Sequence, residues 1–392
     1  MILDIAALRS ETVGCTRVIH FNNAGASLMP DTVWNEVTKF SEQEALWGGY
    51  EAAQRRHKDL EETYHSIAAL IHAKPEEIAL FENATTAWNM AFSSIPFKDG
   101  DRILTSVSEY ASNYMGYLHL KRRVNVSLEV IPNDSYGQTS VEALEDMIDN
   151  RVRLISITHI PTNSGLVNPA ESIGEVANKY GCLYLLDACQ SVGHYPVDVQ
   201  KIGCDMLSSA GRKYLRGPRG TGFLYVNAQK LPELTPPFPD LHSAEWMDEN
   251  TYAFREDARK FESWEFNYAS VAGLNSAVKY ANAIGIETIW KRIQYVAGLL
   301  RRRLKEISGI SVHDIGQIKS GIVTFTHSDF SAEEIQQYLS VKNINVSVST
   351  RDSTLLDMTR RNLEAVVRAS VHYYNTEKEI EILAEALRNL GN

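Results

Sequence analysis

Short apolar runs alternate with longer amphipathic stretches between about residues 60 and 226 of the chain. Several of the short runs are apolar at consecutive positions, as in strands that are buried on both faces. Amphipathic stretches with helical spacing, such as Ser140–Ile148 and Ala170–Tyr180, lie between them. Strands that alternate with helices predict an α/β fold with a mostly parallel seven-stranded sheet. The seven runs are Glu77–Phe81, Arg102–Val107, Ser127–Ile131, Arg153–Thr158, Cys182–Leu186, Asp205–Ser209 and Gly222–Val226.

The pattern changes in the last hundred or so residues. The proline-rich stretch Leu231–Pro239 is predicted to be a surface excursion, and a long amphipathic helix is expected over Trp290–Ile307. Shorter strands and helices follow, which predicts a small carboxy-terminal α+β domain. These elements are expected near Ile310–Val312, Gly321–Thr326, Ala332–Leu339, Asn345–Val348 and Thr376–Leu390.

Composition and charge exclude several classes of protein. The 39 basic and 49 acidic residues give a net charge of −10, and no long basic stripe is present. Nonspecific binding to nucleic acid or to a membrane surface is therefore not expected. No window approaches the length of apolar chain that spans a membrane, and the first residues, MILDIAALRSET, do not form a typical secretion signal. The four cysteines have neither CxxC nor metal-site spacing, so we expect a cytoplasmic enzyme without a disulfide framework or a metal site.

The segment between residues 183 and 226 carries the most specific chemical signal. One predicted strand ends on Asp187, and the next is followed closely by Lys213. Because the carboxyl ends of parallel strands line the ligand crevice, both side chains are expected at one site. A lysine that forms a Schiff base and an acid that keeps a pyridine nitrogen protonated are what pyridoxal 5'-phosphate (PLP) requires.

Each of these residues has an ordinary alternative explanation. A single lysine after a strand is usually a solvated surface residue, and an aspartate at a strand end is usually a turn or helix cap. The glycines around the lysine (211, 217, 220 and 222) favour close backbone approach instead. They precede a strand and not a helix, which argues against a nicotinamide-binding fingerprint.

These residues and two terminal motifs resemble the class V aminotransferase superfamily, which includes cysteine desulfurases, selenocysteine lyases and isopenicillin N epimerases. The similarity extends from FNNAGAS at Phe21–Ser27 to RASVHYYNT at Arg368–Thr376. It implies PLP fold-type I, with a large PLP-binding domain over 51–285 and a small α+β domain formed by 286–392 together with the amino-terminal segment. It also implies that residues 1–50 contribute to the active site, and that the chain forms a homodimer with the site at its interface.

The resemblance assigns roles residue by residue. Lys213 resembles the cofactor-binding catalytic lysine, Asp187 the acid on the pyridine nitrogen, and Gln190 the partner of the phenolic oxygen. Arg368 resembles the residue that binds the α-carboxylate of an amino-acid substrate, for which a bidentate guanidinium is suited. Further cofactor contacts are expected from Thr85, Thr86, Tyr110, Arg212 and Thr162, and further substrate contacts from Asn22, Gly25, Ala26, Tyr50 and Asn163.

One departure from the family pattern guides the functional hypothesis. Cysteine desulfurases carry a nucleophilic cysteine on a loop about fifteen residues before the carboxylate-binding arginine, but here STRDSTLLD has Ser353 near that place and no cysteine follows Cys204. A persulfide needs a thiolate, so desulfurase activity is disfavoured. The sequences GGYEAA, SVSTRDSTLLD and VRASVHYYNT resemble hercynylcysteine sulfoxide lyases instead.

We therefore predict a C–S lyase that eliminates thiol or sulfenate from an S-substituted cysteine or its sulfoxide and yields pyruvate and ammonia. A class V aminotransferase or an amino-acid epimerase is the alternative, since all three begin with loss of the Cα proton. A non-catalytic scaffold is a third hypothesis, against which the intact Lys213 and Asp187 argue.

Overall fold

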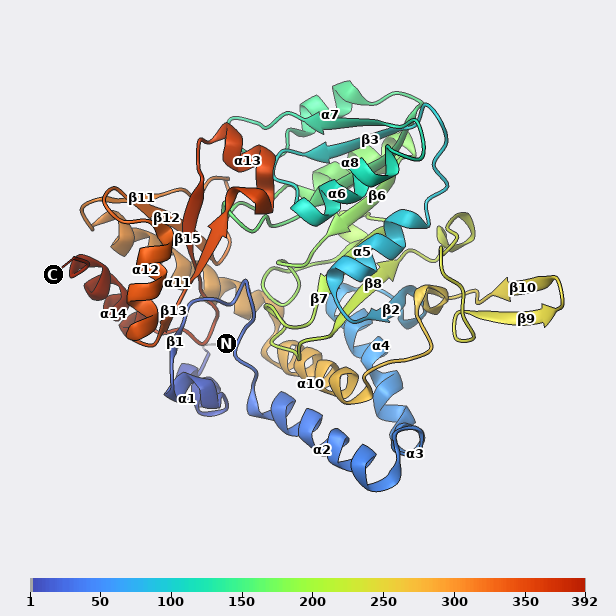
Figure 1. The fold of residues 1–392 in the computed structure, drawn as a ribbon, viewed down its shortest axis with the longest axis horizontal. Helices are drawn as coiled ribbons and strands as arrows, with labels where there is room; N and C mark the ends of the chain where they lie inside the picture. Colours follow the sequence, from blue (N-terminus) through green and yellow to red (C-terminus); the bar gives the residue numbers. More distant parts are fainter. Residues whose placement is uncertain (1–2, 392) are drawn as a thin grey trace.

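A seven-stranded sheet crosses the centre of the molecule in the computed structural model, which describes residues 3–391 (Figure 1). Only β8 runs against its neighbours, because β7 and β2 each pair with it in antiparallel fashion and the other pairs are parallel. The prediction of a mostly parallel seven-stranded sheet is confirmed. In spatial order the strands are β2 (Ile78–Phe81), β8 (Gly222–Val226), β7 (Met206–Ala210), β6 (Leu183–Asp187), β5 (Val152–Thr158), β3 (Arg102–Ser106) and β4 (Ser127–Ile131).

Both faces of this sheet are covered. Leu185 of β6 belongs to one apolar cluster and its neighbour Leu186 to another, as period-two alternation of side chains requires. The helices α5 (Ala84–Ser93) and α6 (Ala111–Leu120) contribute to the first cluster. Helices that contribute to the second cluster include α4 (His57–Ile71), α7 (Val141–Met147), α8 (Ala170–Tyr180) and α10 (Tyr268–Ile284). The helix α2 (Asp31–Trp47) packs on the outside of α10.

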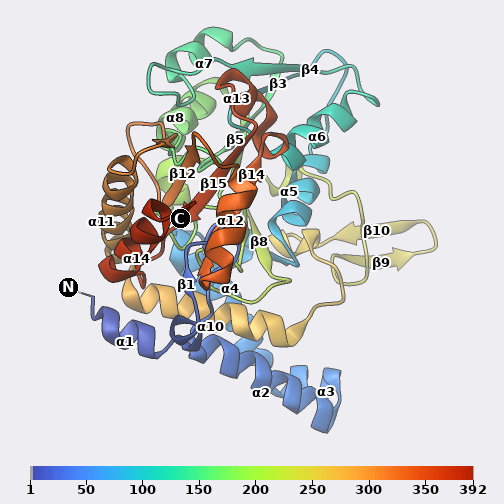
Figure 2. The ribbon, with the colours of Figure 1, turned by 60° about the vertical axis from the view of Figure 1, so that its left-hand side comes forward.

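A second, antiparallel sheet contains four strands from the carboxy-terminal part of the chain (Figure 2). Its order is β11 (Ile310–Val312), β12 (Ile322–His327), β15 (Ala365–Ser370) and β14 (Ser347–Thr350). The helices of this region are α11 (Ile286–Lys305), α12 (Ala332–Val341), α13 (Leu355–Arg360) and α14 (Glu377–Arg388). Elements predicted after residue 289 are thus present, although their ends differ by one to several residues.

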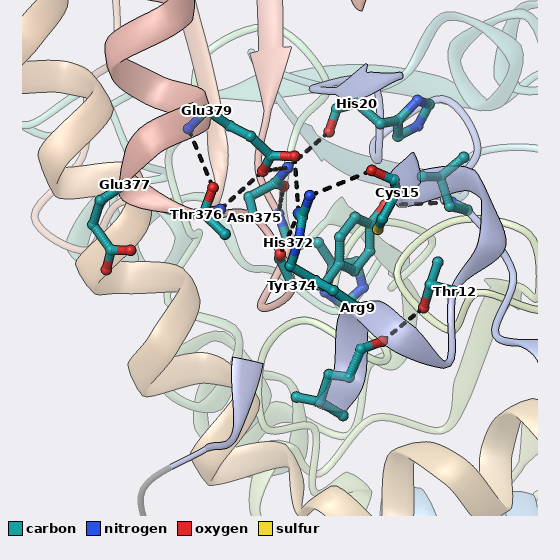
Figure 3. Close-up of polar contacts among 12 residues, drawn as sticks. Arg9, Thr12, Cys15, His20, His372, Tyr374, Asn375, Thr376, Glu377 and Glu379 are labelled. Carbon is teal, nitrogen blue, oxygen red and sulfur yellow. Dashed lines mark hydrogen bonds and ion pairs between the residues drawn. The ribbon is translucent and has the colours of Figure 1, made fainter. Parts of the chain in front are cut away.

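The amino-terminal segment packs against this carboxy-terminal region. Its strand β1 (Ile19–His20) pairs in parallel with β13 (Ile344–Asn345), and α1 (Ile5–Ser10) precedes it. Figure 3 shows the contacts, which include Arg9 Nη1 to Glu379 Oε1 at 2.8 Å and Asn375 Nδ2 to the His20 carbonyl at 3.1 Å. The two ends of the chain are therefore close in space, while the predicted domain boundaries after residues 50 and 285 stay a prediction.

The region after residue 230 differs from the expected surface excursion in two ways. Leu231 and Leu234 are buried, the first of them in the 3-10 helix η3 (Leu231–Glu233). An unpredicted hairpin of β9 (Ala244–Asp248) and β10 (Thr251–Phe254) then projects from the body of the molecule (Figure 1). The remaining elements are η1 (Val13–Thr16), α3 (Gly49–Arg55), η2 (Pro75–Glu77), α9 (Val199–Ile202), η4 (Ala258–Phe261) and η5 (Arg351–Thr354).

Candidate active site

A cavity lies at the carboxyl ends of the central strands. Asp187 is the last residue of β6 and Ala210 the last of β7, so the turn after β7 brings Lys213 to the same cavity as the acid. The two residues on which the sequence prediction depends thus lie at one site, at the sheet edge where α/β folds bind ligands. The lining residues are Asn83, Ala84, Thr85, Tyr110, Asn113, Thr158, Ile160, Thr162, Asp187, Cys189, Gln190, Ala210, Arg212 and Lys213.

Two hydrogen bonds hold the Asp187 carboxylate, which is 6% exposed. Its Oδ1 accepts from the Cys189 backbone N–H at 2.9 Å, and its Oδ2 accepts from Asn113 Nδ2 at 2.9 Å. The same Asn113 amide nitrogen also donates to Glu109 Oε1 at 2.8 Å. Asn113 therefore bridges two buried carboxyl groups and orients the one that would hold a pyridine nitrogen.

Glu109 and Asn113 are site residues that the sequence analysis missed. The Glu109 carboxylate accepts from the backbone N–H groups of Tyr110 at 3.1 Å and Thr158 at 3.2 Å. Burial raises the pKa of Glu109 to about 7, although hydrogen bonds from Thr158 and Asn113 oppose that rise. The signal was an acid just beyond β3, two residues before α6 begins, with an amide in the first turn of that helix.

The lysine follows a tight glycine turn. An added Cβ at Gly211 would lie 2.1 Å from Thr221 Oγ1, and the Gly217 N–H donates to the Gly211 carbonyl at 2.8 Å. Arg216 adopts a left-handed φ of 61° as the chain turns back, and its N–H donates to the Lys213 carbonyl at 2.9 Å. This close backbone packing fixes the position from which the Lys213 amine enters the cavity.

The start of α5 forms a second wall of the cavity and suits an anion. Asn83 caps the helix by accepting from the Thr86 N–H at 2.9 Å, and an added Cβ at Gly222 would lie 2.8 Å from the Asn83 carbonyl carbon. Helix-start amides, with Thr85 and Arg212 beside them, could hold a phosphate group. Thr86 is not among the described residues that line the cavity, although its neighbour Thr85 is.

Gln190 offers an unused polar atom to a bound cofactor. Its Nε2 donates to the Ala24 carbonyl at 3.1 Å, while its buried Oε1 has no hydrogen-bond partner among the described residues. A buried carbonyl oxygen without a partner costs free energy that a ligand hydroxyl would recover. Together with the lysine, the acid and the anion-binding helix start, this atom shows that the residues present fit PLP.

The substrate end of the site is centred on Arg368 of β15. Its guanidinium donates to the Thr162 hydroxyl, to Ser347 Oγ at 3.1 Å and to Asn22 Oδ1 at 3.5 Å. None of the ion pairs found within residues 3–391 involves Arg368. Burial lowers the pKa of Arg368 to about 10, which leaves a cation without a counter-ion where a carboxylate is expected.

The other predicted substrate residues are placed differently. The Gly25 carbonyl accepts from Arg212 and so contacts the site through the backbone, whereas the Ala26 carbonyl lies 2.9 Å from Nε2 of His20, which does not line the cavity. Tyr50 lines a separate cavity, and Asn163 faces the carboxy-terminal segment. Neither Tyr50 nor Asn163 is among the described residues that line the Lys213 cavity.

Comparison with known proteins places the chain in a family. The family model for class V aminotransferases matches residues 19–383. A probable cysteine desulfurase of Methanothermobacter thermautotrophicus is 31% identical over 348 residues, which cover 88% of this chain and 86% of the relative. A probable cysteine desulfurase of Pyrococcus abyssi is 28% identical over 95% of this chain and 94% of its own length. The apo cysteine desulfurase of Thermococcus onnurineus NA1 has a TM-score of 0.92 at 25% identity, covering 100% of this chain and 98% of that structure.

These relatives correct the predicted activity. The prediction of a C–S lyase is wrong, because similar proteins over most of the chain are named cysteine desulfurases. The chain belongs to the class V aminotransferase family and is a PLP-dependent enzyme.

Proposed function

We propose that the enzyme removes the sulfur atom of cysteine and leaves alanine. The single observation that carries this proposal is the uncompensated Arg368 guanidinium at a site that also contains Lys213 and Asp187. Such a site suits a small amino acid with its carboxylate on the arginine. The relatives named cysteine desulfurases favour cysteine as that amino acid.

Each polar group has a part in this reaction. Arg368, together with Thr162 and Asn22, would bind and orient the substrate carboxylate. The Lys213 amine would hold the cofactor and then move a proton at the substrate Cα. Asp187, kept in place by Asn113, would hold a proton at the ring nitrogen. When bound, PLP supplies an electron sink for the pair released at Cα.

We also propose a homodimer in the cytoplasm. The β9–β10 hairpin exposes Trp246 and Tyr252, at 73% and 54%, although a two-stranded hairpin is marginally stable alone. A second copy could cover these side chains. All four cysteines are free, which favours a reducing compartment. Within the described part of the chain, no helix has the length and apolar character of a membrane span.

Product analysis tests the activity. The PLP-loaded enzyme is incubated with L-cysteine and dithiothreitol, and alanine, sulfide and pyruvate are quantified. Alanine and sulfide in equal amounts are expected. Lys213→Ala should form neither, and Lys305→Ala, at an exposed position on α11, should match the unmodified enzyme. Pyruvate in place of alanine would contradict the proposal.

A further inference from the structure

The electron balance of the proposed reaction demands a thiol. If alanine is the product, the electron pair of the broken Cβ–Sγ bond stays on carbon. The sulfur atom therefore leaves at the oxidation level of a persulfide and must bond to another sulfur. A thiolate, and not a hydroxyl group, is the nucleophile that can accept it. The inference that follows rests on the proposed function and concerns the origin of this thiolate.

Three of the four cysteines of the chain lie away from the cavity. Cys182 and Cys204 are 7% and 1% exposed and belong to the apolar cluster beneath the sheet. Burial raises the pKa of the Cys204 thiol far above its usual range. Cys15 lies in η1, where its carbonyl accepts from Arg9, and burial raises its pKa as well. None of the three lines the Lys213 cavity.

Cys189 does line the cavity, but at the end where the cofactor ring is held. Its backbone N–H is bonded to the Asp187 carboxylate at 2.9 Å, two residues earlier in the chain. The turn that follows is closed by the Ser191 and Val192 N–H groups, which both donate to the Ala188 carbonyl. Burial raises the pKa of the Cys189 thiol more than the nearby Lys213 ammonium lowers it. The thiol therefore lies beside Lys213, on a turn whose backbone is held by the acid, and it favours its protonated form.

The segment after β14 cannot bring a thiol either. It contains Ser353, and residues on either side of Ser353 are hydrogen-bonded to the buried Asn163, which follows β5 in the chain. Asn163 Nδ2 donates to Thr354 Oγ1 at 3.0 Å, and its Oδ1 accepts from the Ser349 hydroxyl. Asp357 and Arg361 form an ion pair at 3.0 Å at the far end of α13. These contacts hold a segment that carries hydroxyl groups and no thiol.

We propose that the sulfur acceptor is a thiol that enters the cavity from outside the chain. Its thiolate attacks the substrate Sγ, the Sγ–Cβ bond breaks, and the electron pair stays on Cβ, which takes up a proton. The sum is thiol plus cysteine giving persulfide plus alanine, with no other oxidant or reductant. Tyr110, which lines the cavity, is 37% exposed, so the cavity is open to solvent beside this ring.

Single-turnover analysis tests the origin of the acceptor. PLP-loaded enzyme is held in excess over sulfur-labelled L-cysteine, so that no second cysteine molecule serves as acceptor. Added 2-mercaptoethanol is compared with its S-methyl ether, which has the same shape but no thiol. Alanine is expected only with the thiol, at a rate proportional to thiol concentration, and the labelled sulfur is expected on the added compound. Lys213→Ala is the enzyme-dependence control.

A second arm distinguishes the two sources of an external thiol. A reduced, unfolded cysteine-bearing polypeptide replaces 2-mercaptoethanol, and its S-carboxymethylated form is the control. A faster rate per thiol with the polypeptide indicates a protein acceptor, and a faster rate with the small thiol indicates a metabolite.

Two results would overturn the proposal in different ways. Full alanine yield without added thiol, with labelled sulfur on a cysteine of the chain, would place the acceptor within the enzyme and leave the proposed function intact. Pyruvate, or no product, in every arm would instead contradict the proposed function itself.

Discussion

The cofactor half and the substrate half of the site are built on different principles. Asp187 and Lys213 are 26 positions apart in the numbering and follow adjacent parallel strands, so regular strand geometry brings them together. Arg368 meets Thr162 and Asn22 across sequence separations of 206 and 346 residues. Chemistry at the cofactor thus depends on local strand ends, whereas recognition of the substrate depends on how the two sheets and the amino terminus pack.

Among the contacts that join the halves, three lie close to the site. Gln190, just after β6, donates to the Ala24 carbonyl at 3.1 Å, and Arg212 donates to the Gly25 carbonyl. His194 Nε2 accepts from the Gly321 N–H at 2.8 Å, which ties the turn after β6 to the start of β12. The comparison therefore predicts that changes in the cofactor half lower the rate, changes in the substrate half lower affinity, and changes at the joints lower stability.

The largest effect is expected at Lys213 in the cofactor half. Lys213→Ala removes both the covalent anchor of PLP and the group that moves the Cα proton, so turnover should fall by about 10³-fold or more. The absorption band of covalently bound cofactor should disappear in the same variant. Absorbance spectra and alanine formation provide the measurements. A retained band would show that another lysine binds the cofactor.

Arg368→Lys tests whether the substrate half acts through affinity. Loss of the paired guanidinium contact to a carboxylate costs about 1.5–3 kcal/mol, so the KM for cysteine should rise about tenfold to a hundredfold. The spectrum of the bound cofactor should stay unchanged. Steady-state kinetics beside Arg302→Lys, at an exposed position of α11, checks this split. A fall in kcat with an unchanged KM would remove Arg368 from carboxylate binding.

Asn113→Ala should perturb the cofactor half without changing the substrate half. The bridge from Asn113 Nδ2 to Glu109 and Asp187 would be lost, which leaves two buried carboxyl groups facing each other. We expect PLP to dissociate about tenfold more readily, as for the loss of one hydrogen bond to a charged group. The pH dependence of the cofactor spectrum should shift as well. An unaltered spectrum and dissociation constant would mean that Asp187 is oriented without Asn113.

The smallest effect on turnover is expected at the joint, where His194 is buried and neutral. Burial lowers the pKa of His194 to about 3, so between about pH 6.5 and that value the unfolded chain binds a proton that the folded chain does not. Protonation therefore favours unfolding, and stability falls as the pH is lowered through this window. The contribution is about 1.4 kcal/mol per pH unit.

Denaturant unfolding at several pH values between about 4 and 6.5 tests the joint, because His194 of the unfolded chain takes up its proton in this range. His194→Gln should flatten the pH slope of the unfolding free energy by one proton. His65→Gln, at an exposed position of α4, should leave the slope as it is. Equal pH slopes of the unfolding free energy in the unmodified protein and in both variants would show that His194 is not held neutral by the fold.

The sequence by itself determined the strand order along the chain, the crevice at the strand ends and the pairing of Asp187 with Lys213. Those features depend on the alternation of apolar residues and on the polar residue that ends a strand, and both are local. The reversed β8, the role of Asn163 as a brace and the exposure of Tyr50 in another cavity could not be predicted. They depend on which distant segments pack together, and only the tertiary structure decides that. The absence of a cysteine near Ser353 shows the same limit, because the residue at one position does not reveal which group supplies the thiol.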